Sequence, residues 1–347
     1  MRRLSKAARM PSLNEIHNET STVGSGHDVV RRKYIKALST LTGRNTIVYY
    51  SGWLQKGQIR ELQAVFAVND NDKNGLMATI HQMDRSRGLD LILHTPGGDT
   101  AATESIVDYL RQMFGTNIRA IVPQLAMSAG TMIALSCKEI VMGKHSNLGP
   151  IDPQINGLPA HGIIEEFKRA QTEIGSAQNQ QEQFARMATW QPIIAKYTPA
   201  LIGECGNAIQ WSSAIVTEWL ETGMFVGEPN ATEKANRIVS ELSSHEQTKT
   251  HARHIHVERL QELGVKVIPL EENQELQDAV VTVHHTCMNT LQQTPAVKII
   301  ENQNAISFII QAMMQQQIAF PIPQMQPRAA DLAAQPEPPT PPARSSE

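Results

Sequence analysis

Two short segments carry residues whose types and spacing suit acyl-transfer chemistry. One is a Pro-Gly-Gly turn at residues 96–98, directly after the strand-like run 91–94. The other is Ser-Ala-Gly at residues 128–130, shortly after the strand-like run 120–123. A serine hydroxyl attacks an acyl carbon only when a base takes its proton and hydrogen-bond donors hold the oxyanion. We therefore interpret Ser128 as a candidate nucleophile beside an oxyanion site.

Backbone N–H groups in these two segments are suited to hold an oxyanion. Ala129 follows the serine at a predicted helix start, where free N–H groups and the helix dipole favour negative charge. Gly97 and Gly98 can adopt backbone angles that turn an N–H toward the same point, and Pro96 stiffens the approach. We predict that the N–H groups of Gly98 and Ala129 are the oxyanion donors, with Gly97 beside them.

Each segment also has a plain structural explanation. A Pro-Gly-Gly turn can simply end a strand, and serine is a leading N-cap residue of helices. The two segments nevertheless lie one strand–helix unit apart. Parallel strands place such junctions at the same edge of a sheet, where ligands usually bind. Their joint placement favours a functional site over two unrelated turns.

The elements that must position these residues alternate between strand and helix patterns. The predicted strands are residues 46–50, 91–94, 120–123 and 139–142, and the predicted helices are residues 28–41, 76–83, about 100–114 and a further helix opening at Ser128. Residues 70–75 read as turn or cap chemistry ahead of the second helix. The alternation predicts an α/β fold with a largely parallel sheet covered by helices.

The second half of the chain changes character. Residues from about 162 to 256 are expected to be mostly helical, with breaks at Pro192, at Pro199 and across residues 223–229. A small α/β unit at about 257–300 is expected to close the fold. Its predicted elements are a helix at 257–263, a strand at 265–269 and a helix at 276–291.

The two ends differ in composition from the main domain, which we place at residues 28–312. Residues 1–27 are polar and rich in Ser, Asn and Gly, so they predict a flexible N-terminal arm. Residues 313–347 are rich in Gln, Pro and Ala, and this composition predicts a disordered tail.

Composition limits the classes of protein that are possible. The 347 residues are 41% hydrophobic, which is enough for one large core or two modest ones. A net charge of −3 argues against a nucleic-acid-binding face spread over the whole protein. The three cysteines lie far apart in apolar or helical runs, as expected for reduced thiols in the cytoplasm. No apolar run approaches the roughly 20 residues of a membrane span, so no integral membrane segment is expected.

Three motifs together resemble a known family. They are HTPGG at residues 94–98, MSAGT at 127–131 and GPIDPQ at 149–154. They resemble the Clp protease/crotonase superfamily, and within it the serine dehydrogenase proteinase family, which is related to signal peptide peptidase A. The resemblance extends from about Lys33 to Ile300. It implies a β/α spiral fold with a helical C-terminal extension, assembly into homo-oligomers, and a serine peptidase that acts on peptides or proteins through an acyl-enzyme.

The identity of the general base is less clear from the sequence. Clp-type peptidases have a histidine on the strand after the serine helix, and residues 148–152 contain none. Relatives of signal peptide peptidase A use a lysine on a later helix, and Lys168 matches that position. A lysine base must be neutral, so Lys168 would need apolar surroundings. His145 and His161 remain alternatives, because histidine is the easier base near neutral pH.

A second group of histidines raises the question of a metal. His245, His251, His254 and His256 have spacings that could place two or three imidazoles on zinc. The stretch has no cysteine and few carboxylates, so we predict a solvated or interface helix. We therefore expect no metal and no cofactor.

Two other functions remain open at this level. A crotonase-like acyl-CoA enzyme would use the same oxyanion arrangement without a serine nucleophile, and tight CoA binding would favour it. A non-catalytic oligomeric adaptor would retain only the fold, and failure of Ser128 to become acylated would favour it. The serine at the helix start makes the peptidase the leading hypothesis.

Overall fold

The computed structural model describes residues 15–16, 19, 27–243 and 250–312. Its centre is a seven-stranded sheet with the strand order β11-β10-β1-β2-β3-β5-β9. The strands are β1 (Asn45–Ser51), β2 (Leu89–His94), β3 (Ile118–Val122), β5 (Glu139–Met142), β9 (Val267–Pro269), β10 (Ala296–Asn302) and β11 (Ser307–Gln311). The five strands from β1 to β9 are parallel, while β10 and β11 are antiparallel at the β1 side. The predicted α/β class is confirmed.

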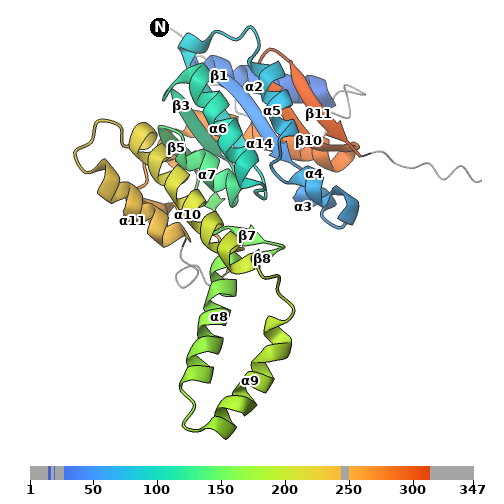
Figure 1. Ribbon diagram of the computed structural model, residues 1–347. Coiled ribbons are helices and arrows are strands. Elements are labelled where there is room, and N and C mark those ends of the chain that lie inside the picture. Colours follow the sequence, from blue (N-terminus) through green and yellow to red (C-terminus); the bar gives the residue numbers. More distant parts are fainter. Residues whose placement is uncertain (1–14, 17–18, 20–26, 244–249, 313–347) are drawn as a thin grey trace, which may run out of the picture. The chain divides into compact units, whose positions relative to one another are not determined.

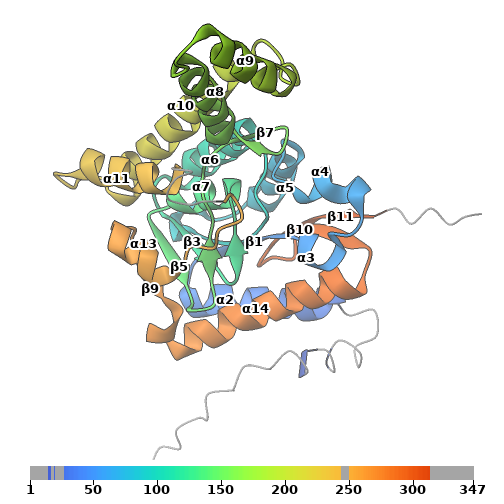
Figure 2. The same cartoon turned by 90° about the horizontal axis from the view of Figure 1, so that it is seen from below.

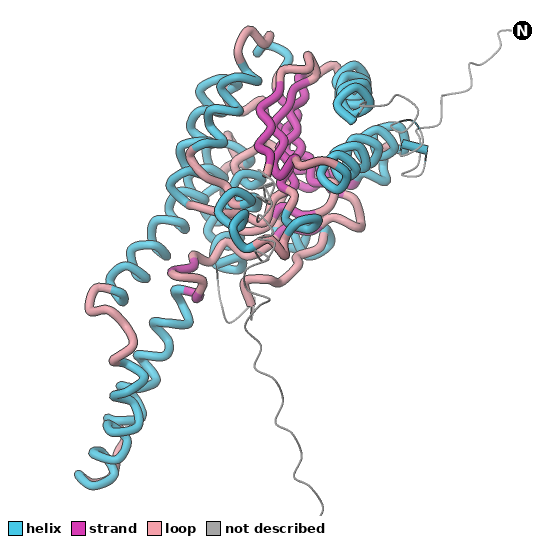
Figure 3. The backbone as a smooth tube through the Cα atoms, turned by 90° about the vertical axis from the view of Figure 1, so that its right-hand side faces the viewer, coloured by secondary structure: helices cyan, strands magenta, loops and turns pink. Residues whose placement is uncertain are grey.

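Helices cover both faces of this sheet (Figures 1 and 2). One face packs against α2 (His27–Thr42) and α14 (Gln274–Gln293), which lie side by side. The other face packs against α5 (Asn71–Ile80), α6 (Thr100–Phe114) and α7 (Ala129–Leu135), together with α10 (Leu201–Trp219), α11 (Ala231–Ser243) and α13 (Val257–Leu263). The strands thus form one layer between two helical layers (Figure 3).

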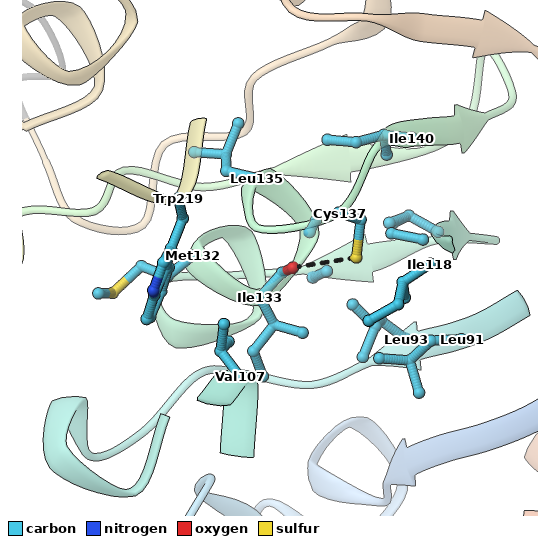
Figure 4. Close-up of a cluster of buried hydrophobic side chains, with 14 of the residues drawn as sticks. Leu91, Leu93, Val107, Ile118, Met132, Ile133, Leu135, Cys137, Ile140 and Trp219 are labelled. Atoms are coloured by element: carbon cyan, nitrogen blue, oxygen red, sulfur yellow. Dashed lines mark hydrogen bonds between the residues drawn. The ribbon is translucent and has the colours of Figure 1, made fainter. Parts of the chain in front are cut away.

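This layering explains why the central strands are apolar without alternation. Leu91 and Leu93 of β2 join the core on the α6–α7 side, while Ile92 between them joins the core on the α2–α14 side. A parallel strand buried on both faces is apolar along most of its length, and the exceptions in β2 are the buried residues Asp90 and His94. The larger core contains Cys137, whose thiol donates to the Ile133 carbonyl at 3.3 Å, and Trp219 of α10 (Figure 4).

Two further helices, α8 and α9, and several short elements complete the described part. They are α3 (Trp53–Lys56), α4 (Gln63–Phe66), β4 (Leu125–Ala126), β6 (Asn147–Leu148), β7 (Gln154–Ile155), β8 (Leu158–Pro159), α8 (Ala160–Gly175), α9 (Gln180–Ile194), a π-helical turn (Leu220–Met224) and 3-10 turns at Arg60–Leu62, Arg85–Arg87 and Leu270–Glu272. Helices α8 and α9 form a pair that extends away from the sheet, and α8 packs its base against α10 (Figure 1).

Some predicted boundaries were wrong. Residues 71–75 belong to helix α5, which begins five residues earlier than predicted, and the Asn69 side chain accepts from the Asn71 N–H at its start. Pro192 does not break a helix but lies within α9, which ends two residues later, so little of the hydrogen-bond ladder is lost. The antiparallel pair β10–β11 was not predicted at all.

The two predicted terminal segments lie mostly outside the described residues. Within the N-terminal one, Ile16 is fully buried and Glu19 accepts from the Tyr34 hydroxyl at 2.8 Å. The predicted tail, residues 313–347, falls entirely outside. Among the helices that the structure describes, none combines the length and apolar character needed to cross a bilayer.

Candidate active site

Ser128 stands at the junction between β4 and α7 in an unusual backbone conformation. Its φ is 50° and its ψ is −114°, a combination that residues other than glycine rarely adopt. It occupies the N-cap position of α7, yet its hydroxyl makes no capping hydrogen bond. The capping explanation therefore does not account for the serine. A strained residue that does no structural work points to a functional position.

Gly97 lies directly against this serine. Its φ is +103°, and a Cβ added to it would stand 2.6 Å from the Ser128 Cβ and 3.2 Å from the Ala129 nitrogen. No side chain fits in that space. The glycine turn and the serine junction, separate in sequence, are thus brought into contact at the same edge of the sheet.

Gly98 is held in an extended conformation by one neighbouring residue. The Val68 N–H donates to the Gly97 carbonyl at 2.8 Å, and the Asp99 N–H donates to the Val68 carbonyl at 2.9 Å. Successive N–H groups of an extended chain point to opposite edges. Because residues 97 and 99 use the edge that faces Val68, the Gly98 N–H points to the other edge.

Ser128, Gly97 and Gly98 line a common cavity of about 450 Å³. Its wall has large apolar side chains from five segments, Trp53, Phe66, Met132, Ile151 and Trp211, beside polar groups. Asp99, Asp152 and His251 are the ionisable residues in its lining. Of these, Asp99 caps α6 by accepting from the Ala102 N–H at 2.8 Å.

Asp152 and His251 form a pair in this cavity. The His251 Nδ1 and the Asp152 Oδ1 are 2.8 Å apart. The Asp152 side chain is fully buried, whereas the His251 side chain is 21% exposed. A carboxylate on Nδ1 selects the tautomer that carries its proton there and leaves Nε2 as an acceptor. Asp152 thus orients a histidine that lines the same cavity as Ser128.

The loop that carries Asp152 is tied to the serine helix. The Thr131 hydroxyl donates to the Ala126 carbonyl and accepts from the Gly149 N–H, both at 2.8 Å. The Ile151 N–H donates to the Leu242 carbonyl at 3.0 Å. These bonds fix the residues on either side of Ser128 to the turn before Asp152.

The segment that carries His251 is held to the same loop by strand pairing. Leu148 and Ile255 exchange two backbone hydrogen bonds, of 3.1 and 2.9 Å. The predicted helix over the histidine cluster is wrong for residues 250–256, which form a turn and this bridge. His245 lies outside the described residues, and His254 and His256 line a different cavity. Among described residues, no group of side chains could hold a metal ion.

The three predicted bases lie elsewhere. Lys168 is exposed on α8, and His161 lies in the first turn of that helix. His145 is exposed in the turn after β5, beside Gly143. None of the three is among the residues that line the Ser128 cavity. In the sequence, Asp152 stands out only as part of the GPIDPQ motif, and the spacing of the clustered histidines predicts a solvated or interface helix for His251.

Part of the chain matches a known family. Residues 61–185 match the model of ClpP-like SDH-type serine proteinases, which confirms the resemblance over that segment. The segment contains the glycine pair, Ser128 and Asp152, but His251 lies beyond it.

Two relatives are uncharacterized proteins of Methanocaldococcus jannaschii. One is 31% identical over 196 residues, which are 56% of this chain and 57% of the relative. The other is 39% identical over 93 residues, which are 27% of this chain and 32% of the relative. The chain thus matches only part of the length of each relative.

Proposed function

From the match of residues 61–185 to ClpP-like serine proteinases, we propose that this chain is a serine peptidase with Ser128 as its nucleophile. The observation that carries the proposal is the cavity that Ser128 shares with the Asp152–His251 pair. A nucleophile, a histidine and a carboxylate that orients it are the three groups of the serine–histidine–aspartate mechanism. Residue order along the chain does not matter for that mechanism, because only geometry and roles define it.

The proposed reaction proceeds in two steps. His251 Nε2 takes the proton from the Ser128 hydroxyl while Oγ attacks the peptide carbonyl, and His251 then gives that proton to the departing amine. Water next attacks the acyl-enzyme with the same base, which releases the acid and restores the serine. The N–H groups of Gly98 and Ala129 hold the oxyanion in both steps, and Asp152 stabilises the charged imidazole.

The cavity wall supports a peptide substrate with apolar side chains. Two tryptophans, a phenylalanine, a methionine and an isoleucine give it apolar surface, and its lining contains no lysine or arginine. We propose peptides or unfolded proteins as substrates and a homo-oligomer as the working form. The reaction as proposed needs no metal.

A Ser128–Lys168 dyad is the alternative assignment of the base. It requires Lys168 to lose contact with water, since a lysine acts as a base only when neutral. Exposed on α8, Lys168 would reach that state only through contact with a second copy of the chain or with substrate. The two assignments of the base are separable by mutation.

Labelling of the full chain with a fluorophosphonate probe tests the proposal, together with hydrolysis of apolar fluorogenic peptides. We expect Ser128→Ala and His251→Ala to lose both activities. Asp152→Asn should reduce hydrolysis by up to about 10⁴-fold, since the histidine tautomer is no longer fixed. His254→Ala is the matched control, because His254 is exposed on the same segment and lines another cavity.

Each other outcome has a definite meaning. If Lys168→Ala abolishes labelling while His251→Ala does not, the base is Lys168. If the parent protein is neither labelled nor hydrolytic, the peptidase proposal is refuted and a non-catalytic role remains.

A further inference from the structure

A buried ion pair, Lys298–Asp72, contacts the backbone segment 67–69, which pairs with Gly98. Lys298 of β10 places its Nζ 2.7 and 2.9 Å from the two carboxylate oxygens of Asp72, in the first turn of α5. Both side chains are fully buried. The Lys298 Nζ also donates to the Ala67 carbonyl at 2.8 Å, so it contacts three acceptor oxygens.

The two residues of the pair hydrogen-bond to both ends of one short backbone segment, residues 67–69. Lys298 holds the Ala67 carbonyl, and the Asp72 Oδ2 accepts from the Asn69 N–H at 3.0 Å. The same oxygen accepts from the Tyr49 hydroxyl at 2.6 Å, which restrains the carboxylate further. Val68 lies between the Ala67 carbonyl and the Asn69 N–H that the pair holds.

Val68 in turn holds Gly98. Its N–H and its carbonyl pair with residues 97 and 99, which leaves the Gly98 N–H at the opposite edge. Two successive sets of hydrogen bonds therefore connect the ion pair to the proposed oxyanion donor. From these contacts we infer that Lys298 and Asp72 are positioning residues, which fix the direction of the Gly98 N–H. The inference rests on the proposed peptidase function.

Stability alone is a poor reason for this pair. Burying two charges carries a desolvation cost that their attraction barely offsets, and apolar residues of similar volume are often equally stabilising. Apolar residues, however, cannot bond a carbonyl at position 67 or an amide at position 69. Directional support of the Val68 segment is what the charged pair supplies and an apolar pair would lack.

The test compares two buried ion pairs that share strand β10. Lys298→Met with Asp72→Asn removes both charges of the first pair, so neither is left buried and unpaired. The matched control is Arg31→Met with Glu301→Gln. Arg31 and Glu301 are also fully buried, with Nε 2.6 Å from Oε2, and they join β10 to α2. Lys298 and Glu301 lie on opposite faces of the strand, because they are three residues apart.

We expect the Lys298/Asp72 double variant to lower kcat by about 100-fold, comparable to the loss of one oxyanion donor, with KM nearly unchanged. The Arg31/Glu301 control should lower the unfolding midpoint but keep the kcat of the parent when assayed well below that midpoint. Circular dichroism and urea denaturation establish that each variant is folded. If the Lys298/Asp72 double variant does not fold, Tyr49→Phe is the milder change, and it should also lower kcat and not KM.

The inference and the proposed function fail in different ways. A hydrolytic parent with a Lys298/Asp72 variant of unchanged kcat, or with equal kcat losses in both double variants, overturns the inference alone. A parent that neither hydrolyses peptides nor reacts with the probe overturns the proposed function and the inference with it.

Discussion

Replacement of Gly97 by alanine tests whether the glycine turn and the serine must touch. The new Cβ would lie 2.6 Å from the Ser128 Cβ, whereas ordinary contacts begin at 3.4 Å. Ser128 must therefore shift, and a displacement of about 1 Å is enough to slow a positioned reaction about 100-fold. The positive φ adds a backbone cost of about 1–3 kcal/mol, which should lower the free energy of unfolding.

Gly264→Ala separates the two effects. Gly264 has a φ of +95°, close to that of Gly97, but a Cβ there would meet nothing within 4 Å. In urea denaturation both variants should lose the backbone contribution to stability, and Gly97→Ala should lose more because of its clash with Ser128. Only Gly97→Ala should lose the rate of fluorophosphonate labelling, measured as a time course at fixed probe concentration. Labelling of Gly97→Ala at the parent's rate would refute the contact as a requirement of the site.

Three further outcomes follow from single residues. Ser128→Gly should raise the free energy of unfolding by about 1 kcal/mol while abolishing labelling, because glycine tolerates the positive φ; a lower urea midpoint would contradict the strain argument. Burial lowers the pKa of His284 to about 3 and also lowers the pKa of His94. The unfolded chain therefore binds protons that the folded chain does not, and stability should fall as the pH drops from 6.5 toward 3, by at most about 1.4 kcal/mol per pH unit for each histidine. Urea midpoints from pH 7 to 5 measure this slope, which His284→Asn should reduce. Burial raises the pKa of Cys137 and of Cys287 to about 12, so iodoacetamide at pH 8 should modify them only after unfolding; rapid modification of the native protein would show that these thiols are accessible.

The elements around Ser128 were predictable because their signals are local. The apolar run at residues 91–93 of β2, the glycine turn after it and the start of α6 follow one another within a few residues. The contact between Gly97 and Ser128 followed from a general rule about parallel strands, not from their separation in sequence. Local pattern and chain topology were sufficient there.

The pairing of His251, the proposed base, with Asp152 was not predictable in the same way. His251 comes beside Asp152 only because Ile255 pairs with Leu148, and no periodicity in either segment reports that pairing. The clustered histidines predict a helix face, and nothing in their spacing distinguishes His251 from the others. The one signal in the sequence was the position of Asp152 between Ile151 and Pro153. These two residues stiffen the backbone, and a stiff backbone suits a carboxylate that must orient another side chain. The role of Lys168 stays a prediction.

The position of β10 has a consequence for the order of events during synthesis. Strand β1 is followed closely in the chain by its parallel partner β2, whereas its other neighbour consists of residues 296–302 and is made much later. Until those residues exist, one edge of β1 has no partner, and an open edge invites pairing with other chains. The same late strand brings Lys298 to Asp72. A nascent chain therefore acquires this support of the Val68 segment only after residue 298 has been translated, later than every residue proposed for the reaction.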